Sequence, residues 1–468
     1  MKTTWKLAAV AGFALIAAVL AIPTTAADSN EDAVPAKPTF AKDISRIFQE
    51  KCEECHRKGT AAPMSLVTYQ EVRPWAKAIR ERVITRNMPP WHIDKTVGIQ
   101  KFSNDRSLSD EQIATIVKWV DSGAPMGDPK DMPPPKQWQD GNGWVLAKQF
   151  GQPDLILKSE DYTIPAQGQD VWFRPITDVP LTEARWVRAV EMRPGTLAGR
   201  RIMHHVLAGL IQDEPGARPA RANADDGNAT DANTSDNSNA GVSGPGLLME
   251  WAIGKNYDIY CPNTGKLLLP GSRISWELHI HAVGEEIRDH AELAVYLYPK
   301  GETPKYRTRL TLFGATGNTS ARLDIPPNTI AVTQGYQTLR QPARLENFQP
   351  HMHLRGKAML IEAILPNGTV QTLSYVNTFN FNWMNNYIYA EDAAPVLPKG
   401  TIIHVTAWHD NTTANKNNPD PEQWVGWGDR TVDEMAHAWV NVTYISEEDY
   451  QAWLAKNKPD RPASASRQ

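Results

Sequence analysis

Two hydrophobic patterns divide this chain, and one replaces the other across a proline-rich stretch. Before residue 125 the apolar side chains recur at helical spacing, and after residue 153 they alternate along short segments. Ser109 and Gln112 fit a capping box ahead of the clearest helical stripe, and Gly123 would end that helix. The stripe occupies positions i, i+3, i+4 and i+7, namely Ile113, Ile116, Val117 and Val120. The N-terminal part is therefore predicted to be helical.

The longer C-terminal part alternates apolar and polar residues, which is typical of half-buried strands. Turn-forming residues separate these segments, and short strands spaced in this way favour β-sandwiches. The strands that we expect cover residues 184–192, 203–211, 273–281, 291–298, 357–365, 402–409 and 436–444. Residues 213–246 interrupt the pattern with Asn, Asp, Ala, Ser and Gly, and we interpret them as a disordered insertion.

These patterns predict a multidomain chain, since 468 residues suffice for about two to four domains. The expected units are a signal peptide (1–27), a helical domain (40–124), a Pro-rich linker (125–152), a first β-sandwich (153–305), a second β-sandwich (306–450) and a tail (451–468). The disordered insertion belongs to the first sandwich.

The first residues have the organisation of a signal peptide. Lys2 and Lys6 precede an apolar run at residues 7–22, and Ala26 and Ala27 offer small residues at a cleavage site. The run is short for a membrane span, which needs about 20 residues. We therefore expect a periplasmic or secreted protein without a membrane span after cleavage. The alternative is an uncleaved membrane anchor.

Cys52, Cys55 and His56 form a C-x-x-C-H motif, the attachment signature of c-type haem. Each cysteine sulfur can form a thioether with a haem vinyl group, and the histidine then ligates the iron. The alternative is a redox dithiol followed by chance by a histidine, but no thioredoxin-like βαβ pattern lies nearby. Only Cys261 remains outside the motif, so the chain is not a disulfide scaffold. The helical unit at 40–124 around this motif resembles a class I cytochrome c.

Such a haem would need a second axial ligand, and we expect Met88 to provide it. Met88 lies in a Met-Pro loop between two predicted helices, which resembles the cytochrome c pattern. His92 is a rival that would give bis-histidine ligation and a lower potential than His/Met ligation. Met64 is a second rival, although its closeness to the motif suits packing at the haem edge.

Histidines and one methionine in the C-terminal part are candidate metal ligands. His351 and His353 would project from one face of a strand, because residues i and i+2 face the same way. Imidazole suits copper, zinc, iron and nickel, whereas the thioether of Met435 favours copper. Two exposed strand histidines are the plain alternative for a lone His-x-His pair. A second set lies upstream and comprises His204, His205, His279 and His281.

The order of these motifs resembles that of the copper type II, ascorbate-dependent monooxygenase family, which includes dopamine β-monooxygenase and peptidylglycine α-hydroxylating monooxygenase. The motifs are His204-His205, His279, His351-x-His353 and Glu434-Met435. The resemblance covers about two-thirds of the chain. It implies two tandem jelly-roll sandwiches with one copper each, facing each other across an open cleft. The predicted fold class is therefore a small all-α cytochrome c domain followed by two all-β jelly-roll sandwiches.

The resemblance also assigns the ligands of two coppers. They are His204, His205 and His279 for the electron-transfer copper, and His351, His353 and Met435 for the copper that binds dioxygen. Adjacent residues of a flat strand face opposite sides, so His204 and His205 can share a metal only where the strand bends or ends. The sequence shows no such bend. His281 shares a face with His279, and His437 shares one with Met435, so both stay open as ligands.

We therefore expect an exported, copper-dependent monooxygenase, an oxidoreductase that hydroxylates an aliphatic C–H of a small molecule with O2. Electrons would pass from an external reductant or redox protein through the fused c-type haem. Gln349 replaces a substrate-binding arginine of the family's peptide-amidating enzyme, and His437 and Trp439 replace its asparagine and tyrosine, so we expect no peptidylglycine substrate. With a net charge of −4 and no Lys/Arg run, nucleic acid is not an expected partner. The alternative is a non-enzymatic cytochrome c–copper protein for electron relay or copper binding.

Overall fold

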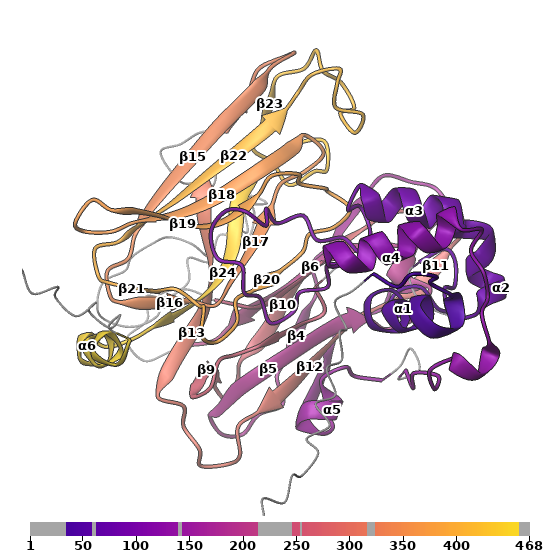
Figure 1. Cartoon of the computed structure of the whole chain (residues 1–468). Coiled ribbons are helices and arrows are strands. Elements are labelled where there is room, and N and C mark those ends of the chain that lie inside the picture. Colours follow the sequence, from indigo (N-terminus) through magenta and orange to yellow (C-terminus); the bar gives the residue numbers. More distant parts are fainter. Residues whose placement is uncertain are drawn as a thin grey trace, which may run out of the picture.

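The computed structural model describes residues 34–58, 62–138, 143–213, 246–252, 255–315 and 323–457. The predicted signal peptide lies outside these residues, as does the predicted insertion apart from its two end residues. None of the helices in the described part of the chain is long and apolar enough to span a membrane. Figure 1 shows α1 (Ser45–Lys51), α3 (Ala76–Ile84) and α4 (Asp110–Asp121) grouped beside the β-structure, with α6 (Glu447–Lys456) on the opposite side.

The N-terminal helices surround a small apolar core that contains Phe48, Ile116 and Trp119, all fully buried. The other helical elements are η1 (Phe40–Ile44), α2 (Tyr69–Val72), η2 (Arg73–Trp75), η3 (Pro129–Asp131), α5 (Ala147–Phe150) and η4 (Gly199–Arg201). The expected capping box begins α4, because Ser109 Oγ accepts the backbone N–H of Gln112 at 3.1 Å and the Gln112 side chain accepts that of Ser109 at 3.0 Å. The helix prediction for this stretch is confirmed.

One sheet of 16 strands runs through most of the β-structure. Its main path is β1 (Leu155–Lys158), β12 (Ala291–Leu297), β5 (Arg185–Pro194), β9 (Thr264–Leu268), β13 (Tyr306–Ala315), β7 (Leu247–Ala252), β6 (Met203–Ile211), β10 (Arg273–Ile280) and β3 (Val171–Phe173). The strands off this path are β4 (Ile176–Asp178), β8 (Tyr257–Ile259), β16 (Ala343–Leu345), β17 (Asn347–His351), β20 (Tyr387–Ile388), β21 (Val396–Leu397) and β24 (Ala436–Tyr444).

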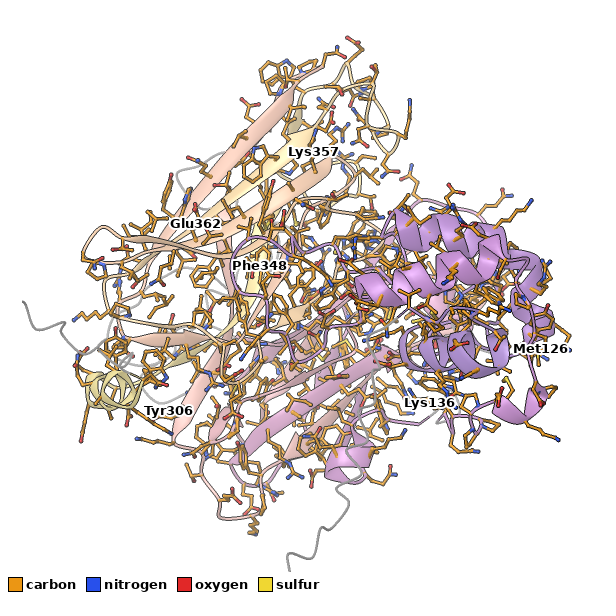
Figure 2. All side chains as sticks on the ribbon, in the orientation of Figure 1. Met126, Lys136, Tyr306, Phe348, Lys357 and Glu362 are labelled. Atoms are coloured by element: carbon orange, nitrogen blue, oxygen red, sulfur yellow. The ribbon has the colours of Figure 1, made fainter. Side chains whose placement is uncertain are left out.

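A second layer gives the C-terminal part a sandwich-like packing. It is a four-stranded sheet of β15 (Ile330–Thr338), β22 (Ile402–Asp410), β18 (Gly356–Ile364) and β19 (Val370–Val376). Two strand pairs stand apart, β2 (Tyr162–Ile164) with β11 (Ile287–Asp289), and β14 (Asp324–Ile325) with β23 (Val425–Gly426). Phe348, Ile361 and Ala438 belong to the core between the layers, and Figure 2 shows Phe348 near the middle of the molecule. A separate core around Val206 and Trp276 fills the N-terminal β-structure.

The strands that the alternation predicted are all present as β5, β6, β10, β12, β18, β22 and β24. Their observed ends lie within two residues of the expected ones. The strand predictions are therefore confirmed, because each of these strands packs at least part of one face into a core.

The predicted fold class is wrong. We expected a small all-α cytochrome c domain followed by two all-β jelly-roll sandwiches. The protein is instead mostly β, with 37% strand and 16% helix, and its short N-terminal helices form no clear all-α cytochrome domain in the part of the chain that the structure describes. A large sheet replaces the two expected sandwiches because β13 pairs with β24 on one side and with β7 and β9 on the other. Ladder hydrogen bonds therefore join the two halves.

The stretch after α3 also departs from the expected domain, because residues 91–104 dock on the C-terminal β-structure. Ile93 forms a β-bridge with Val376. Trp91 packs edge-on against Tyr387 with ring centroids 4.7 Å apart. The helical segment is thus tied to the sheet by its own loop rather than closed on itself.

Candidate metal centre

A β-bulge brings the upstream histidines together. Along the β6–β10 ladder, His205 is opposite His279, but the next pair is Met203 with Ile280. His204 is therefore the extra residue of β6, and an extra residue bends its strand and redirects side chains. This is the bend that two adjacent ligands require.

The three imidazoles converge on one point. Nδ1 of His205 lies 3.2 Å from Nδ1 of His204 and 3.4 Å from Nδ1 of His279. Two nitrogens that bind one metal at about 2.0–2.1 Å in tetrahedral geometry lie about 3.3 Å apart. Among the described residues, the ligand atoms of these three histidines all lie within 4.8 Å of one another. The triad can hold a metal ion, and its nitrogen donors are compatible with copper.

Asp170 and Trp172 contact the His279 ring and fix its orientation. His279 Nε2 donates to Asp170 Oδ2 at 2.9 Å, which leaves Nδ1 with a lone pair that faces the centre. Trp172 stacks on the His279 ring at 4.3 Å and 13°. Carboxylates in this position orient a ligating histidine and raise its basicity. Sequence reasoning missed both residues, since Asp170 lies 109 residues upstream of His279 and β3 is too short to show a period.

Burial keeps the three imidazoles neutral, which is the form that binds a metal. Desolvation, followed by the neighbouring His279, lowers the pKa of His204 to about 3. Desolvation also holds the pKa of His205 well below its usual range. It lowers the pKa of His279 as well, although the hydrogen bond to Asp170 acts in the opposite direction.

The second histidine set lies where β17 meets β24. His351 ends β17 and pairs with His437 of β24, with the two rings 4.9 Å apart at 20°. The rings of His351 and His353 are 5.5 Å apart. All three side chains are buried, and burial is the first cause that lowers the pKa of each, to about 3 for His437. The structure therefore adds His437 to the neighbourhood of His351.

Hydrogen bonds to Glu434 connect the loop that carries Met435 to the second histidine set. The Glu434 carboxylate accepts the backbone N–H of His353 at 2.8 Å and that of Arg355 at 2.5 Å. His353 Nδ1 donates to the carbonyl of Asp433 at 3.0 Å, which leaves Nε2 for a metal. Met435 is half-buried and directly precedes β24. The loop that carries Met435 is thus held against the backbone of His353.

The two histidine sets adjoin each other. The rings of His205 and His351 meet edge to face with centroids 6.0 Å apart. Thr431, on the loop before Met435, donates from Oγ1 to Asp170 Oδ2 at 3.1 Å. The described residues therefore bring the sets into contact, where the resemblance implied an open cleft. His281, the other open candidate, is half-buried and stands outside the triad.

The C-x-x-C-H motif follows α1 directly. His56 Nδ1 donates to the carbonyl of Met64 at 3.1 Å, which leaves Nε2 for an axial bond. Burial raises the pKa of the Cys52 thiol to about 12 and also raises that of Cys55. Before any thioether forms, both sulfurs are therefore protonated thiols.

The candidate second axial ligands lie in different places. Met64 packs against the same helical core as Cys52. Met88 is half-buried in the turn after α3. The backbone N–H of His92 donates to Tyr387 Oη at 3.2 Å, which places His92 against the C-terminal β-structure.

No family model matches the chain, and no curated protein matches it. The structure of PNGF-II has 11% identity and a TM-score of 0.28, covering 63% of this chain and 65% of that one. A putative α-L-fucosidase from Bacteroides ovatus has 6% identity and a TM-score of 0.17, covering 66% and 41%. The infectious bursal disease virus VP2 subviral particle has 12% identity and a TM-score of 0.17, covering 64% and 72%. The chain thus spans less than two-thirds of the length of the first two structures.

We expect Asp170→Asn to weaken metal binding at the histidine triad about 10–100-fold, because the amide removes the charge that orients His279. Asp161→Asn is the matched control, since Asp161 is a half-exposed carboxylate that pairs with Arg288. Titration of the copper-loaded protein with a competing chelator measures both affinities. Equal affinities of the two variants would contradict the role given to Asp170.

Proposed function

We propose that this protein is an exported, copper-dependent monooxygenase that hydroxylates an aliphatic C–H of a small molecule with O2. The observation that carries the proposal is the contact between two histidine sets, one of which has the spacing of a metal site. One copper would bind His204, His205 and His279, and the other His351, His353 and Met435. The chain would then be a relative of the copper type II, ascorbate-dependent monooxygenases, located in the periplasm or secreted.

The proposed reaction is R–H + O2 + 2 e⁻ + 2 H⁺ → R–OH + H2O. The two bound coppers would supply the affinity for O2 and one electron each. The chain's own residues would hold the ions, since the buried imidazoles are neutral and Glu434 fixes the loop beside His353. The thioether of Met435 is a soft donor that favours the reduced ion, the form that must meet oxygen.

A c-type haem on Cys52, Cys55 and His56 would deliver the electrons, which an external reductant or redox protein would supply. The free Nε2 of His56 supports this role, because Nδ1 is already used by a backbone carbonyl. Aromatic rings connect the loop after α3 to β17, the strand that ends at His351. Trp91 contacts Tyr387 at 4.7 Å, and Tyr387 stacks on Phe348 of β17 at 6.4 Å.

The surroundings of Gln349 support a substrate other than a peptidylglycine. Gln349 is 0% exposed, and its Nε2 donates to Glu250 Oε2 at 2.7 Å. A fully buried amide that is bonded to Glu250 cannot supply the exposed positive charge that the arginine of the peptide-amidating enzyme offers to a peptide carboxylate. We therefore propose a small-molecule substrate without naming its class further.

We expect Met435→Ile to lower substrate-dependent oxygen uptake by orders of magnitude, because the soft ligand is lost. Isoleucine keeps roughly the volume and apolar character, so the free energy of unfolding should fall by about 1.5 kcal/mol or less. Met192→Ile is the matched control, since Met192 is buried in the N-terminal β core. Oxygen consumption with product analysis, beside a thermal melt, measures both effects.

Two results of that experiment would count against the proposal. Turnover of Met435→Ile near that of the wild type would make Met435 a packing residue. A copper-loaded, reduced wild type without substrate-dependent oxygen uptake would instead favour an electron-relay or copper-binding protein.

We expect one covalent haem per chain after expression with a haem maturation system, because the motif supplies two thioether sulfurs and an axial histidine. Intact mass and a pyridine haemochrome spectrum measure it. The pair Cys52→Ser and Cys55→Ser should remove the haem, whereas Cys261→Ser should retain it. A wild-type mass without the haem increment would rule this cofactor out.

A further inference from the structure

A buried hydrogen bond joins the strand of the second histidine set to the strand beside the first. Gln349 of β17 donates from Nε2 to Glu250 Oε2 of β7 at 2.7 Å. Gln349 lies two residues before His351, and β7 pairs with β6 so that Ala252 is opposite His205. Both bonded side chains are buried, at 0% and 1% exposure. The bond therefore spans the junction between the two sets.

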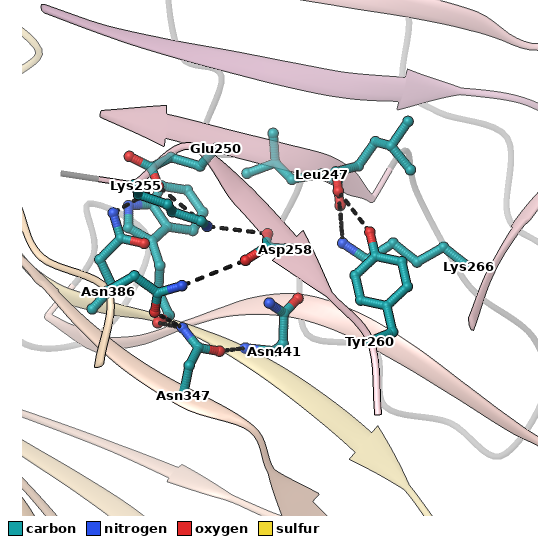
Figure 3. A network of polar contacts seen from close by, with 12 residues as sticks. Leu247, Glu250, Lys255, Asp258, Tyr260, Lys266, Asn347, Asn386 and Asn441 are labelled. Atoms are coloured by element: carbon teal, nitrogen blue, oxygen red, sulfur yellow. Dashed lines mark hydrogen bonds and ion pairs between the residues drawn. The ribbon is translucent and has the colours of Figure 1, made fainter. Parts of the chain in front are cut away.

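Charged and amide side chains continue from this bond back to β17 (Figure 3). Lys255 Nζ lies 3.5 Å from Glu250 Oε2 and 3.1 Å from Asp258 Oδ2. Asn386 Nδ2 donates to Asp258 Oδ1 at 3.4 Å, and Asn347 Nδ2 donates to Asn386 Oδ1 at 2.6 Å. All of these residues are buried. We call Glu250, Gln349, Lys255, Asp258, Asn347 and Asn386 the junction network.

Asn347 also binds the junction network to β24. Its Oδ1 accepts the backbone N–H of Asn441 at 2.7 Å, and its Nδ2 donates to the carbonyl of Trp439 at 3.2 Å. Asn347 and Gln349 are the first and third residues of the five-residue strand β17, whose last residue is His351. Side chains thus fix β17 to β7, β8 and β24 directly before its metal-ligand candidate.

Stability alone is a poor explanation for this network. The free energy lost when two charges leave water is about as large as the free energy gained from their attraction. Apolar side chains of similar volume therefore often stabilise a protein as well as a buried ion pair does. Oε1 of Glu250 and Oε1 of Gln349 already lack a hydrogen-bond partner among the described residues. The contacts that the network does make are directional, so a shift of β17 would break them and leave further buried groups without partners. The junction network therefore selects one placement of β17 relative to β7.

We propose that Glu250 and Gln349, supported by Lys255 and Asp258, are positioning residues that hold His351 against His205, so that the two metal centres work as one fixed pair. The inference rests on the proposed function for the identity of the centres. Its consequence is that electrons pass between the centres without a movement of one half of the protein relative to the other.

Gln349→Met tests the inference, because it keeps the length of the side chain and removes the donor. We expect copper content to stay the same, while the magnetic interaction between the two Cu(II) ions weakens in the EPR spectrum. Turnover should fall about 10²-fold through kcat, with little change in KM, since the reacting centres are displaced. Gln334→Met, at an exposed position of β15, is the control and should change none of these.

A swap variant separates positioning from simple loss of packing. Glu250→Gln combined with Gln349→Glu restores the hydrogen bond with donor and acceptor exchanged. We expect it to recover most of the EPR interaction and most of the turnover. A swap variant no better than Gln349→Met would contradict the positioning role.

Amide hydrogen exchange of the metal-free protein gives a readout that does not depend on copper. We expect Gln349→Met to raise exchange in β17 and β7, and Gln334→Met to leave it unchanged. Unchanged exchange and an unchanged EPR spectrum in Gln349→Met would overturn the inference and leave the proposed function standing. A wild type that binds two coppers without an EPR interaction would overturn the inference alone, whereas a wild type that binds fewer than two coppers would overturn both.

Discussion

The extra residue in β6 is the constraint on which the candidate metal centre depends. In a regular antiparallel ladder, His204 would face away from His205, and a single metal could not reach both. The register shift between β6 and β10 removes this alternation, so that Nδ1 of His204 and Nδ1 of His279 both lie within 3.4 Å of Nδ1 of His205. The centre is therefore a property of strand pairing as much as of histidine content. Straightening β6 would disperse the ligands even with all of them present.

Continuity of the sheet explains why the second histidine set lies next to the first. β13 pairs with β24 from Arg307 to Ala315 and also reaches β7 and β9, so β17 and β6 belong to one hydrogen-bonded body. The junction network then fixes the side-chain contacts across this body. Had the halves been separate sandwiches, a linker would have set the distance between the sets. The single large sheet therefore matters for the proposed chemistry, because its strand pairing sets the distance between the two histidine sets.

Local patterns predicted the parts of this structure that depend on neighbours in sequence. The alternation gave β6, β10 and β24, and the capping box gave the start of α4. The ligand candidates followed from residue type and order, yet their convergence did not, because a bulge depends on how distant strands pair. Asp170 was missed because it precedes a three-residue strand without a period. The fold class was wrong because a ligand-based resemblance says nothing of the ladder through β13.

Copper-edge anomalous diffraction from crystals of the copper-loaded protein tests the central claim most directly. The claim is that the bulged strand places His204, His205 and His279 on one metal, beside a second at His351 and His353. The account predicts one peak within bonding distance of all three Nδ1 atoms and a neighbouring peak at the second set. A triad peak bound by only one of the two adjacent histidines, or no copper at the triad, would contradict it.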